Sequence, residues 1–319
     1  MNKYVFLVVL LTVHFTEIFA QKHLKDNLIV KGNIPSISLA DGGQALFFAQ
    51  RNKVFRWSRT ENRISDSIDF QTSGKVIALD YIFKNKMIVA GFQSGELFIA
   101  GRTGKTERLQ MTGGAIISLK FSNDGNSLAV GTADCNLSMW DLANRRILWS
   151  KKGHSDHVLS ISFSPTDSIV FSGSADKRVG IWDRQSGVVY GYLTESGSWV
   201  RKLAISKETS TLYAATDVGA IYSWKIDGTN GVFSVKNKET LSWATALAVG
   251  EEGTFVSGFK NGYFVFRTKF GNYHTNFRQP VIDVVLISEN EYISFFVSVL
   301  NQGIYFVDLA DKVFKLSSK

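Results

Sequence analysis

The sequence repeats itself at an interval of 42 residues. One stretch ends in Ser-Met-Trp140-Asp141, a second ends in Gly-Ile-Trp182-Asp183, and Trp224 follows at the same interval. A repeat of about 40 to 45 residues is typical of a four-stranded blade of a β-propeller. Because one blade cannot bury its apolar faces alone, we expect a ring of stacked blades.

The second repeat shows the pattern of a blade most clearly. It begins with Gly153-His154 and continues through an apolar run at 158–163, a Ser-Pro-Thr-Asp turn, a second run at 169–174 and the closing Trp182-Asp183. Short apolar runs between turn-forming residues predict strands that are buried between neighbouring sheets. This segment resembles the WD40 repeat family, whose blades begin near Gly-His and close with Trp-Asp.

The resemblance implies a buried, hydrogen-bonded tetrad that holds the blade together. In the family the tetrad consists of a His, a Ser or Thr, the Asp of the second hairpin turn and the Trp. Carried over to this sequence, these residues are His154, Ser172, Asp176 and Trp182, with Ser174 as the alternative serine.

Seven apolar runs are spaced so that they can form the innermost strands of seven blades. They are predicted to begin at Ile34, Val76, Ile116, Val158, Val200, Ala244 and Val281. The positions that correspond to Trp182 in the other blades are Trp57, Ala100, Trp140, Trp224, Phe266 and Val307. The third blade keeps Asp134 but has Gly113-Gly114 in place of the histidine, so its hydrogen bonds must be made by other groups. We expect an all-β fold, a seven-bladed propeller of four-stranded antiparallel blades within residues 21–319.

The ends of such a ring need a device that closes it, because unpaired strand edges invite aggregation. The strand-like run at 27–32 precedes the first inner strand and has no blade of its own, so it is predicted to be the outer strand of the seventh blade. The run at 303–308 would be the third strand of that blade. The run at 312–316 competes for the outer position, and the sequence leaves this choice open.

Residues 1–20 have the order of a secretory signal peptide. A short positive segment ends at Lys3, a ten-residue run that is apolar except for Thr12 extends from Tyr4 to Val13, and Ala20 precedes Gln21. Ten residues are too few for a membrane span, which needs about 20. We expect cleavage after Ala20, a periplasmic or secreted protein similar to exported proteins of Gram-negative bacteria, and no transmembrane segment in the mature chain. A buried N-terminal helix, a membrane anchor and a cytoplasmic protein are the alternatives.

The net charge of +8, from 36 basic and 28 acidic residues, favours anionic partners. The excess is concentrated between residues 51 and 110, where a basic stretch runs from Arg51 to Arg63. A solvated outer strand explains this stretch better than a nucleic-acid site does, because export separates the protein from nucleic acid. An anionic surface or polymer stays an alternative to a protein partner.

No sequence pattern predicts catalytic, cofactor-binding or metal-binding residues. The chain lacks Gly-x-Ser-x-Gly and His-Glu-x-x-His, and its single cysteine, Cys135, can form neither an intramolecular disulfide nor a cysteine-pair metal site. Segment 101–106 resembles the end of a phosphate-binding loop, but Ile99 occupies the place of the first glycine and no helix pattern follows. A hairpin turn is the better interpretation of this segment.

The residues just before the inner strands should gather around the central opening of the ring. His157, Trp199 and Trp243 occupy this position in three consecutive blades, and Arg201 follows just inside it. Trp and Arg are the residue types that most often dominate binding energy at protein interfaces. These four residues are therefore predicted to bind a partner. The alternative is that both indoles tuck between blades and fill the ring.

These observations favour a non-enzymatic protein-interaction scaffold that presents a binding face around the central opening and uses no cofactor. The rival is a propeller enzyme, a hydrolase or lyase that acts on a carbohydrate or a lactone-like substrate at the opening. Two or three carboxylates or histidines converging there would favour the enzyme. The predicted entry positions supply one histidine and no acid.

Overall fold

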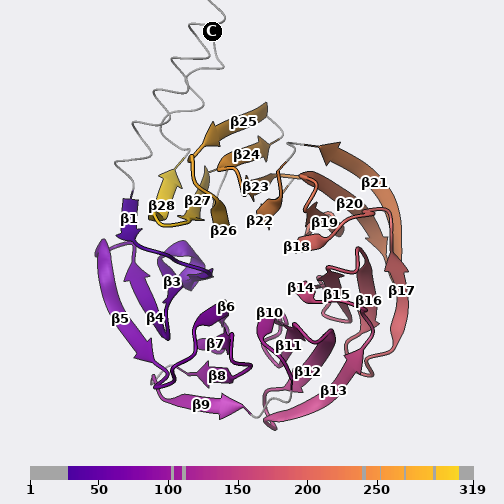
Figure 1. Ribbon diagram of the computed structural model, residues 1–319, viewed down its shortest axis with the longest axis horizontal. Helices are drawn as coiled ribbons and strands as arrows, with labels where there is room; N and C mark the ends of the chain where they lie inside the picture. The colour runs from indigo at the N-terminus through magenta and orange to yellow at the C-terminus, as the bar shows by residue number, and fades with distance from the viewer. Residues whose placement is uncertain are drawn as a thin grey trace, which may run out of the picture.

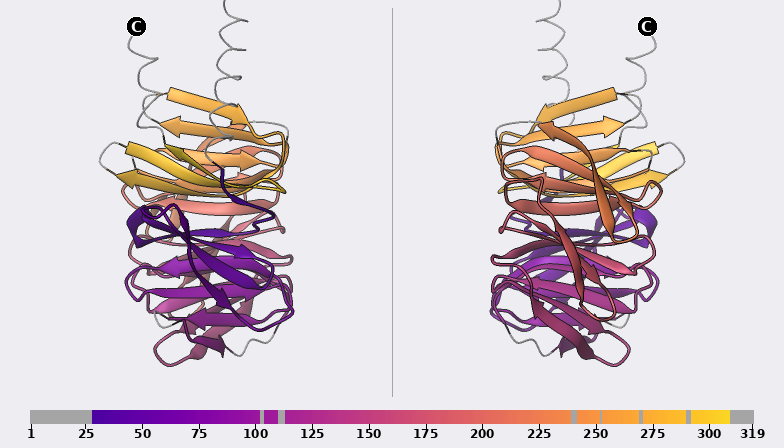
Figure 2. Two further views of the ribbon diagram at one scale, coloured as in Figure 1. Left: turned by 90° about the vertical axis from the view of Figure 1, so that its left-hand side faces the viewer. Right: turned by 90° about the vertical axis from the view of Figure 1, so that its right-hand side faces the viewer.

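The computed structural model describes residues 28–101, 104–109, 113–238, 242–251, 253–268, 271–289 and 292–308. These residues form seven four-stranded antiparallel sheets around a central opening (Figure 1). The predicted seven-bladed all-β propeller is confirmed. Seen edge-on, the strands run between the two faces of the ring, and the loops gather at those faces (Figure 2).

Blades 1 to 6 each use four consecutive strands, ordered from the opening outward. Blade 1 contains β2 (Ile37–Ala40), the 3-10 helix η1 (Asp41–Gly43), β3 (Ala45–Gln50), β4 (Lys53–Ser58) and β5 (Arg63–Asp69). Blade 2 contains β6 (Val76–Ile82), β7 (Met87–Phe92), β8 (Leu97–Ala100) and β9 (Thr106–Leu109). Blade 3 contains β10 (Ile116–Phe121), β11 (Ser127–Thr132), β12 (Asn136–Asp141) and β13 (Arg146–Lys152).

The second half of the ring repeats this arrangement. Blade 4 contains β14 (Val158–Phe163), β15 (Ile169–Ser174), β16 (Val179–Asp183) and β17 (Val189–Leu193). Blade 5 contains β18 (Val200–Ser206), β19 (Thr211–Thr216), β20 (Ala220–Asp227) and β21 (Asn230–Lys238). Blade 6 contains β22 (Ala244–Val249), β23 (Phe255–Phe259), β24 (Tyr263–Thr268) and β25 (Gly271–Asn276). Blade 7 contains β26 (Val281–Glu289), β27 (Tyr292–Val299), β28 (Gly303–Asp308) and, as its outer strand, β1 (Leu28–Lys31).

Six of the seven predicted starts of the inner strands are confirmed, and the first is wrong. β2 begins at Ile37, whereas the sequence pattern placed its start at Ile34. Pro35 follows Ile34 and has no N–H to donate to a strand ladder, so regular pairing begins later, between Ile37 and Phe48. Ile34 is nevertheless fully buried, as is Val158 at the start of blade 4. The pattern therefore located the buried position correctly but not the strand boundary.

The apolar core lies between neighbouring blades. The largest buried side chain of blade 5, Trp224, belongs to one cluster with Ile169, Phe171 and Ile181 of blade 4. Trp182 and the six positions predicted to correspond to it occupy equivalent positions in the third strands of their blades. They pair with Leu46, Ile88, Leu128, Val170, Leu212, Val256 and Phe295 of the second strands. Ring formation thus buries the face that a single blade would expose.

The N-terminal strand closes the ring as predicted. β1 pairs antiparallel with β28, and Lys31 lies opposite Gly303. Gly303 has a φ of 128°, and a Cβ added to it would lie 1.7 Å from the carbonyl oxygen of Val30. Glycine is therefore required where the closing strand meets the turn before β28.

Two sequence predictions fall on segments outside the described residues. These are the signal peptide at 1–20 and the competing strand at 312–316. Among the residues that the structure describes, no helix is long and apolar enough to cross a membrane.

Candidate partner-binding surface

We call the face at which each outer strand hands over to the next inner strand the entry face. The carbonyl oxygen of Trp199, just before β18, accepts a hydrogen bond from the N–H of Asp217, just after β19. In blade 6 the carbonyl oxygen of Trp243 accepts a bond of 2.9 Å from the N–H of Lys260 in the same way. The turns between second and third strands therefore lie on the entry face too.

Both tryptophans predicted to bind a partner are exposed on this face. The exposed fraction is 38% for Trp199 and 40% for Trp243, whereas Trp224 of blade 5 is fully buried. The two indoles therefore do not fill the space between blades. Partly exposed indoles on a rigid scaffold can bury further apolar area against a partner without a large loss of side-chain entropy.

A β-bulge places Arg201 between these indoles. In blades 2 to 7 the register shifts after the first residue of the inner strand, and in blade 5 the shift falls between Val200 and Lys202. A bulge re-aims the extra side chain. The Arg201 guanidinium carbon lies 5.4 Å from the ring centre of Trp199 and 4.3 Å from that of Trp243.

A second cation extends this stack. The Lys260 Nζ lies 3.8 Å from the ring centre of Trp243. Trp199, Arg201, Trp243 and Lys260 thus form one row over blades 5 and 6, which we call the cation–indole row. Each cation–indole contact contributes about 0.5–1 kcal/mol at an exposed site, so the contacts favour the stacked arrangement of these side chains.

The positive charges of the row are not neutralised by an ion pair with any residue that the structure describes. Burial lowers the pKa of Arg201, and the nearby negative charge of Asp217 opposes this shift. The Arg201 Nε and one carboxylate oxygen of Asp217 are both buried without a hydrogen-bond partner among the described residues. Because guanidinium keeps its charge at physiological pH, the row presents positive charge beside exposed indole. Asp217 offsets part of the Arg201 charge without an ion pair to it, and we call the remaining charge of the row uncompensated.

His157, the fourth predicted binding residue, does not join the row. One of its ring nitrogens hydrogen-bonds the carbonyl oxygen of Ala133 in blade 3, and Asp156 lies beside it. Its imidazole is thus directed toward the preceding blade. Lys260, in contrast, was missed by the sequence analysis. Its position in the repeat could have indicated it. Lys260 directly follows the second strand of blade 6, and in blades 2 to 7 the residue at this position lies opposite the entry position.

The four residues assigned to the tetrad form one buried hydrogen-bonded chain in blade 4. The Trp182 Nε1 donates to the Ser172 Oγ at 2.7 Å, and this oxygen lies 2.7 Å from the His154 Nε2. The His154 Nδ1 lies 2.8 Å from the Asp176 carboxylate. Since a carboxylate only accepts, the proton is on Nδ1, and Nε2 accepts from the serine hydroxyl. Burial tends to raise the pKa of Asp176, but hydrogen bonds from His154 and Arg178 outweigh it and hold the pKa well below its usual range.

The alternative serine and the third blade differ from this arrangement. Ser174 donates to the carbonyl oxygen of Asp156 and accepts from the backbone N–H of Asp176, whereas it is Ser172 that bonds the His154 imidazole and the Trp182 indole. In blade 3, Asp134 accepts from Thr132 and from Asn136, which replace the missing histidine. Within the part of the chain that the structure describes, the Trp140 Nε1 is buried without a hydrogen-bond partner, because Val130 stands where blade 4 has Ser172.

The basic stretch from Arg51 to Arg63 is largely neutralised. Lys53 pairs with Asp69, Arg56 pairs with Asp41 at 2.7 Å, and Arg63 pairs with Glu61. The expected solvated outer strand is right only for Arg63, which begins β5, because Lys53 and Arg56 lie in the third strand, β4. The three pairs reduce the charge that this stretch offers to an anionic partner.

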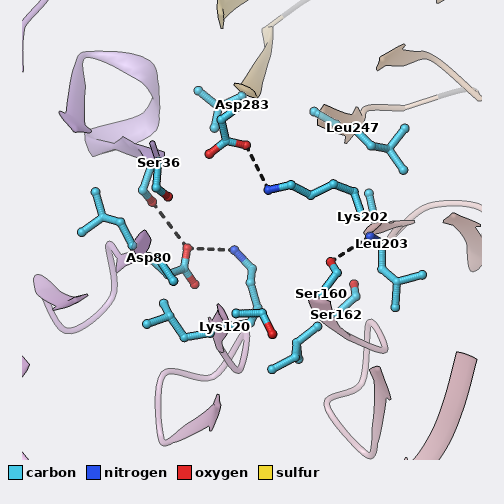
Figure 3. Close-up of a pocket in the computed structure, with 18 of the residues that line it drawn as sticks. Ser36, Asp80, Lys120, Ser160, Ser162, Lys202, Leu203, Leu247 and Asp283 are labelled. Carbon is cyan, nitrogen blue, oxygen red and sulfur yellow. Dashed lines mark hydrogen bonds and ion pairs between the residues drawn. The ribbon is translucent and has the colours of Figure 1, made fainter. Parts of the chain in front are cut away.

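The central opening contains a cavity of about 440 Å³, lined by the inner strands of all seven blades. Two carboxylates reach it from positions that the sequence analysis did not consider (Figure 3). Asp80 pairs with Lys120 at 2.8 Å, and Asp283 pairs with Lys202 at 3.4 Å.

Both carboxylates are committed to contacts that tie blades together. Asp80 of blade 2 also accepts from the backbone N–H of Phe121 in blade 3, and Asp283 of blade 7 accepts from the N–H of Ile37 in blade 1. A general acid or base must instead be free to exchange a proton with a substrate. Among the described residues, no group of three His, Cys, Asp or Glu side chains could hold a metal ion. The contacts of Asp80 and Asp283 therefore indicate that these carboxylates stabilise the ring and do not act in catalysis.

The family model described as WD domain, G-beta repeat matches residues 106–141 and 145–183. Each match ends at the Trp-Asp pair of its blade, and the second contains the hydrogen-bonded chain around Ser172. These two segments are therefore similar to WD40 repeats. The two matches cover β9 of blade 2 and parts of blades 3 and 4, and the other blades are four-stranded antiparallel sheets of the same kind.

Several curated proteins are similar to parts of this chain. The chain is 27% identical over 162 residues to Periodic tryptophan protein 2 of Arabidopsis thaliana, and this alignment covers 48% of the chain and 17% of that protein. It is 29% identical over 139 residues to the U5 small nuclear ribonucleoprotein 40 kDa protein of Dictyostelium discoideum, covering 41% and 39%. It is 24% identical over 241 residues to Autophagy-related protein 16 of Arabidopsis thaliana, covering 73% and 47%.

These matches span less than half the length of each relative. All three relatives come from eukaryotes, so they do not support the expected similarity to bacterial exported proteins.

Proposed function

We propose that this WD40 propeller is a non-enzymatic protein-interaction scaffold that binds its partner through the entry face of blades 5 and 6. The observation that carries the proposal is the pair of exposed indoles, Trp199 and Trp243, held in place by Arg201 and Lys260. Exposed aromatic side chains fixed by their neighbours are the usual centre of an interface.

The relatives support this class of function. One of them is named as a protein of the U5 small nuclear ribonucleoprotein, which is an assembly of several components. The alternative, an enzyme acting at the central opening, has less support. Its two carboxylates, Asp80 and Asp283, are each bound to a lysine and to a backbone N–H of a neighbouring blade.

The proposal is tested with the double variant Trp199→Ala and Trp243→Ala. The partner is first co-purified with the native protein, identified and purified separately. The variant should lose about 2–4 kcal/mol of binding free energy, because truncation of an interface indole removes buried area at the centre of the contact. Its melting temperature should change little, since both indoles are partly exposed in the free protein.

A matched control is Phe83→Ala. Phe83 is 58% exposed and lies in the turn between β6 and β7, on the face opposite the entry face. This variant should bind the partner normally. An indole variant that folds and still binds with full affinity would show that the partner docks elsewhere.

A further inference from the structure

We propose that the partner segment bound at the cation–indole row is acidic, with a carboxylate placed against Arg201 and Lys260. This inference rests on the proposed function and adds the chemistry of the partner to it. It is carried by three features of the row: its geometry, its uncompensated charge and the contrast with the other cations near the opening.

The geometry places positive charge and apolar surface side by side. Arg201 lies over both indoles, and Lys260 lies over Trp243. A segment that covers the exposed indole surface must also cover the two cations. An acidic side chain flanked by apolar groups fits such a surface, because it can pair with the cations while its neighbours bury the indoles.

The uncompensated charge decides against a neutral or basic segment. Covering a cation without supplying an anion or an acceptor costs desolvation energy. Arg201 already bears part of this cost, since its Nε is buried without a hydrogen-bond partner. A carboxylate is the group that forms charge-assisted hydrogen bonds with a guanidinium fork.

Other cations of this protein, in contrast, form ion pairs with carboxylates. Lys202, the residue next to Arg201, pairs with Asp283 in the cavity, and Lys120 pairs with Asp80 (Figure 3). Arg178 of blade 4 is bound to Asp176. Asp217 influences Arg201 electrostatically but forms no ion pair with it among the described residues. The row is therefore where an external carboxylate is needed.

The experiment is an unbiased selection followed by measured affinities. A random peptide display library is selected on the whole protein, and enriched peptides are synthesised and measured by fluorescence anisotropy. We expect enriched peptides to contain clustered Asp or Glu. The double variant Arg201→Gln and Lys260→Gln should bind them at least about tenfold more weakly, with the difference largest at low salt.

Two controls separate charge from fold. Arg59→Gln removes a cation that also stacks on an aromatic ring, that of Phe306, but lies in the turn after β4 on the opposite face. It should leave peptide affinity unchanged. In the row itself, Arg201→Lys and Lys260→Arg keep the charge and should retain most of the affinity for acidic peptides.

The outcomes distinguish this inference from the function on which it rests. Enriched peptides that are neutral or basic, yet lose binding in Trp199→Ala with Trp243→Ala, would overturn the acidic partner and leave the entry-face scaffold standing. Peptides whose binding is indifferent to both indoles would overturn the scaffold site itself. Binding of heparin or anionic lipid vesicles that depends on Arg201 and Lys260, without binding of any acidic peptide, would also overturn the inference.

Discussion

At the scale of single residues, one serine hydroxyl distinguishes blade 4 from blade 3. The Ser172 Oγ accepts from the Trp182 indole and connects it to His154 and Asp176. In blade 3 the corresponding residue is Val130, and the Trp140 N–H is left buried without an acceptor. A buried hydrogen bond that is made contributes modestly, but a buried polar group without a partner costs about 1–3 kcal/mol.

This difference predicts unequal effects of one substitution in the two blades. Trp182→Phe should lower the free energy of unfolding by about 1–3 kcal/mol more than Trp140→Phe does, because only Trp182 donates a hydrogen bond. Both indoles are 2% exposed, so the change in packing is similar in the two variants. Chemical denaturation of both variants measures the difference. Equal losses would mean that the hydrogen bond contributes nothing to stability.

At the scale of elements, the closure of blade 7 joins the two ends of the chain. β1 comes from the beginning of the described chain and β28 from its end, and they pair in one sheet (Figure 1). Closure removes the unpaired edges that an open stack of blades would expose. The closest approach is at Gly303, where an added Cβ would collide with the carbonyl group of Val30 and the Cα of Lys31.

Gly303→Ala should therefore destabilise the ring more than a substitution at a glycine with free space. Its added methyl group would overlap the Val30 carbonyl oxygen, so we expect a loss of at least about 3 kcal/mol. Gly42→Ala is the control, because Gly42 also has a positive φ, 63°, but nothing within 4 Å of the added carbon. The control should lose only about 1–2 kcal/mol. Thermal unfolding of both variants measures this, and similar melting temperatures would contradict the tight closure.

At the scale of the whole molecule, the ring separates two tasks. The inner strands join the blades through Asp80, Lys120, Lys202 and Asp283, while the entry face of blades 5 and 6 presents indoles and unpaired cations. A rigid ring keeps Trp199 and Trp243 in place before a partner arrives, and such preorganisation lowers the cost of binding.

Export of this molecule stays a prediction from residues 1–20. We expect the native protein to begin at Gln21, because the positive start, the apolar run and Ala20 follow the order of a cleaved signal. N-terminal sequencing of protein from its natural source measures this directly. Cytosolic protein that retains Met1 would contradict export. The propeller itself does not depend on the result, since β1 begins at Leu28.

Several features of the fold could be predicted because they recur once per blade. The spacing of Trp140, Trp182 and Trp224 indicated the ring, and apolar runs located six inner strands at their first residue. Repetition makes such predictions reliable, since each blade must bury the same positions against its neighbours. The error at Ile34 arose because burial and strand pairing separate where Pro35 interrupts the ladder.

Features that join different blades, or that depend on exposure, could not be predicted from the repeat. Lys202 and Asp283 are 81 residues apart, and only closure of the ring brings them together across the opening. The repeat pattern placed Trp199, Arg201 and Trp243 around the opening, but it did not determine whether the indoles are exposed, and it gave no prediction for Lys260. A repeat determines where a residue lies within its blade. Which side chains meet across blades, and whether they stay in solvent, is decided by the bulge at Arg201 and by the packing of one blade on the next.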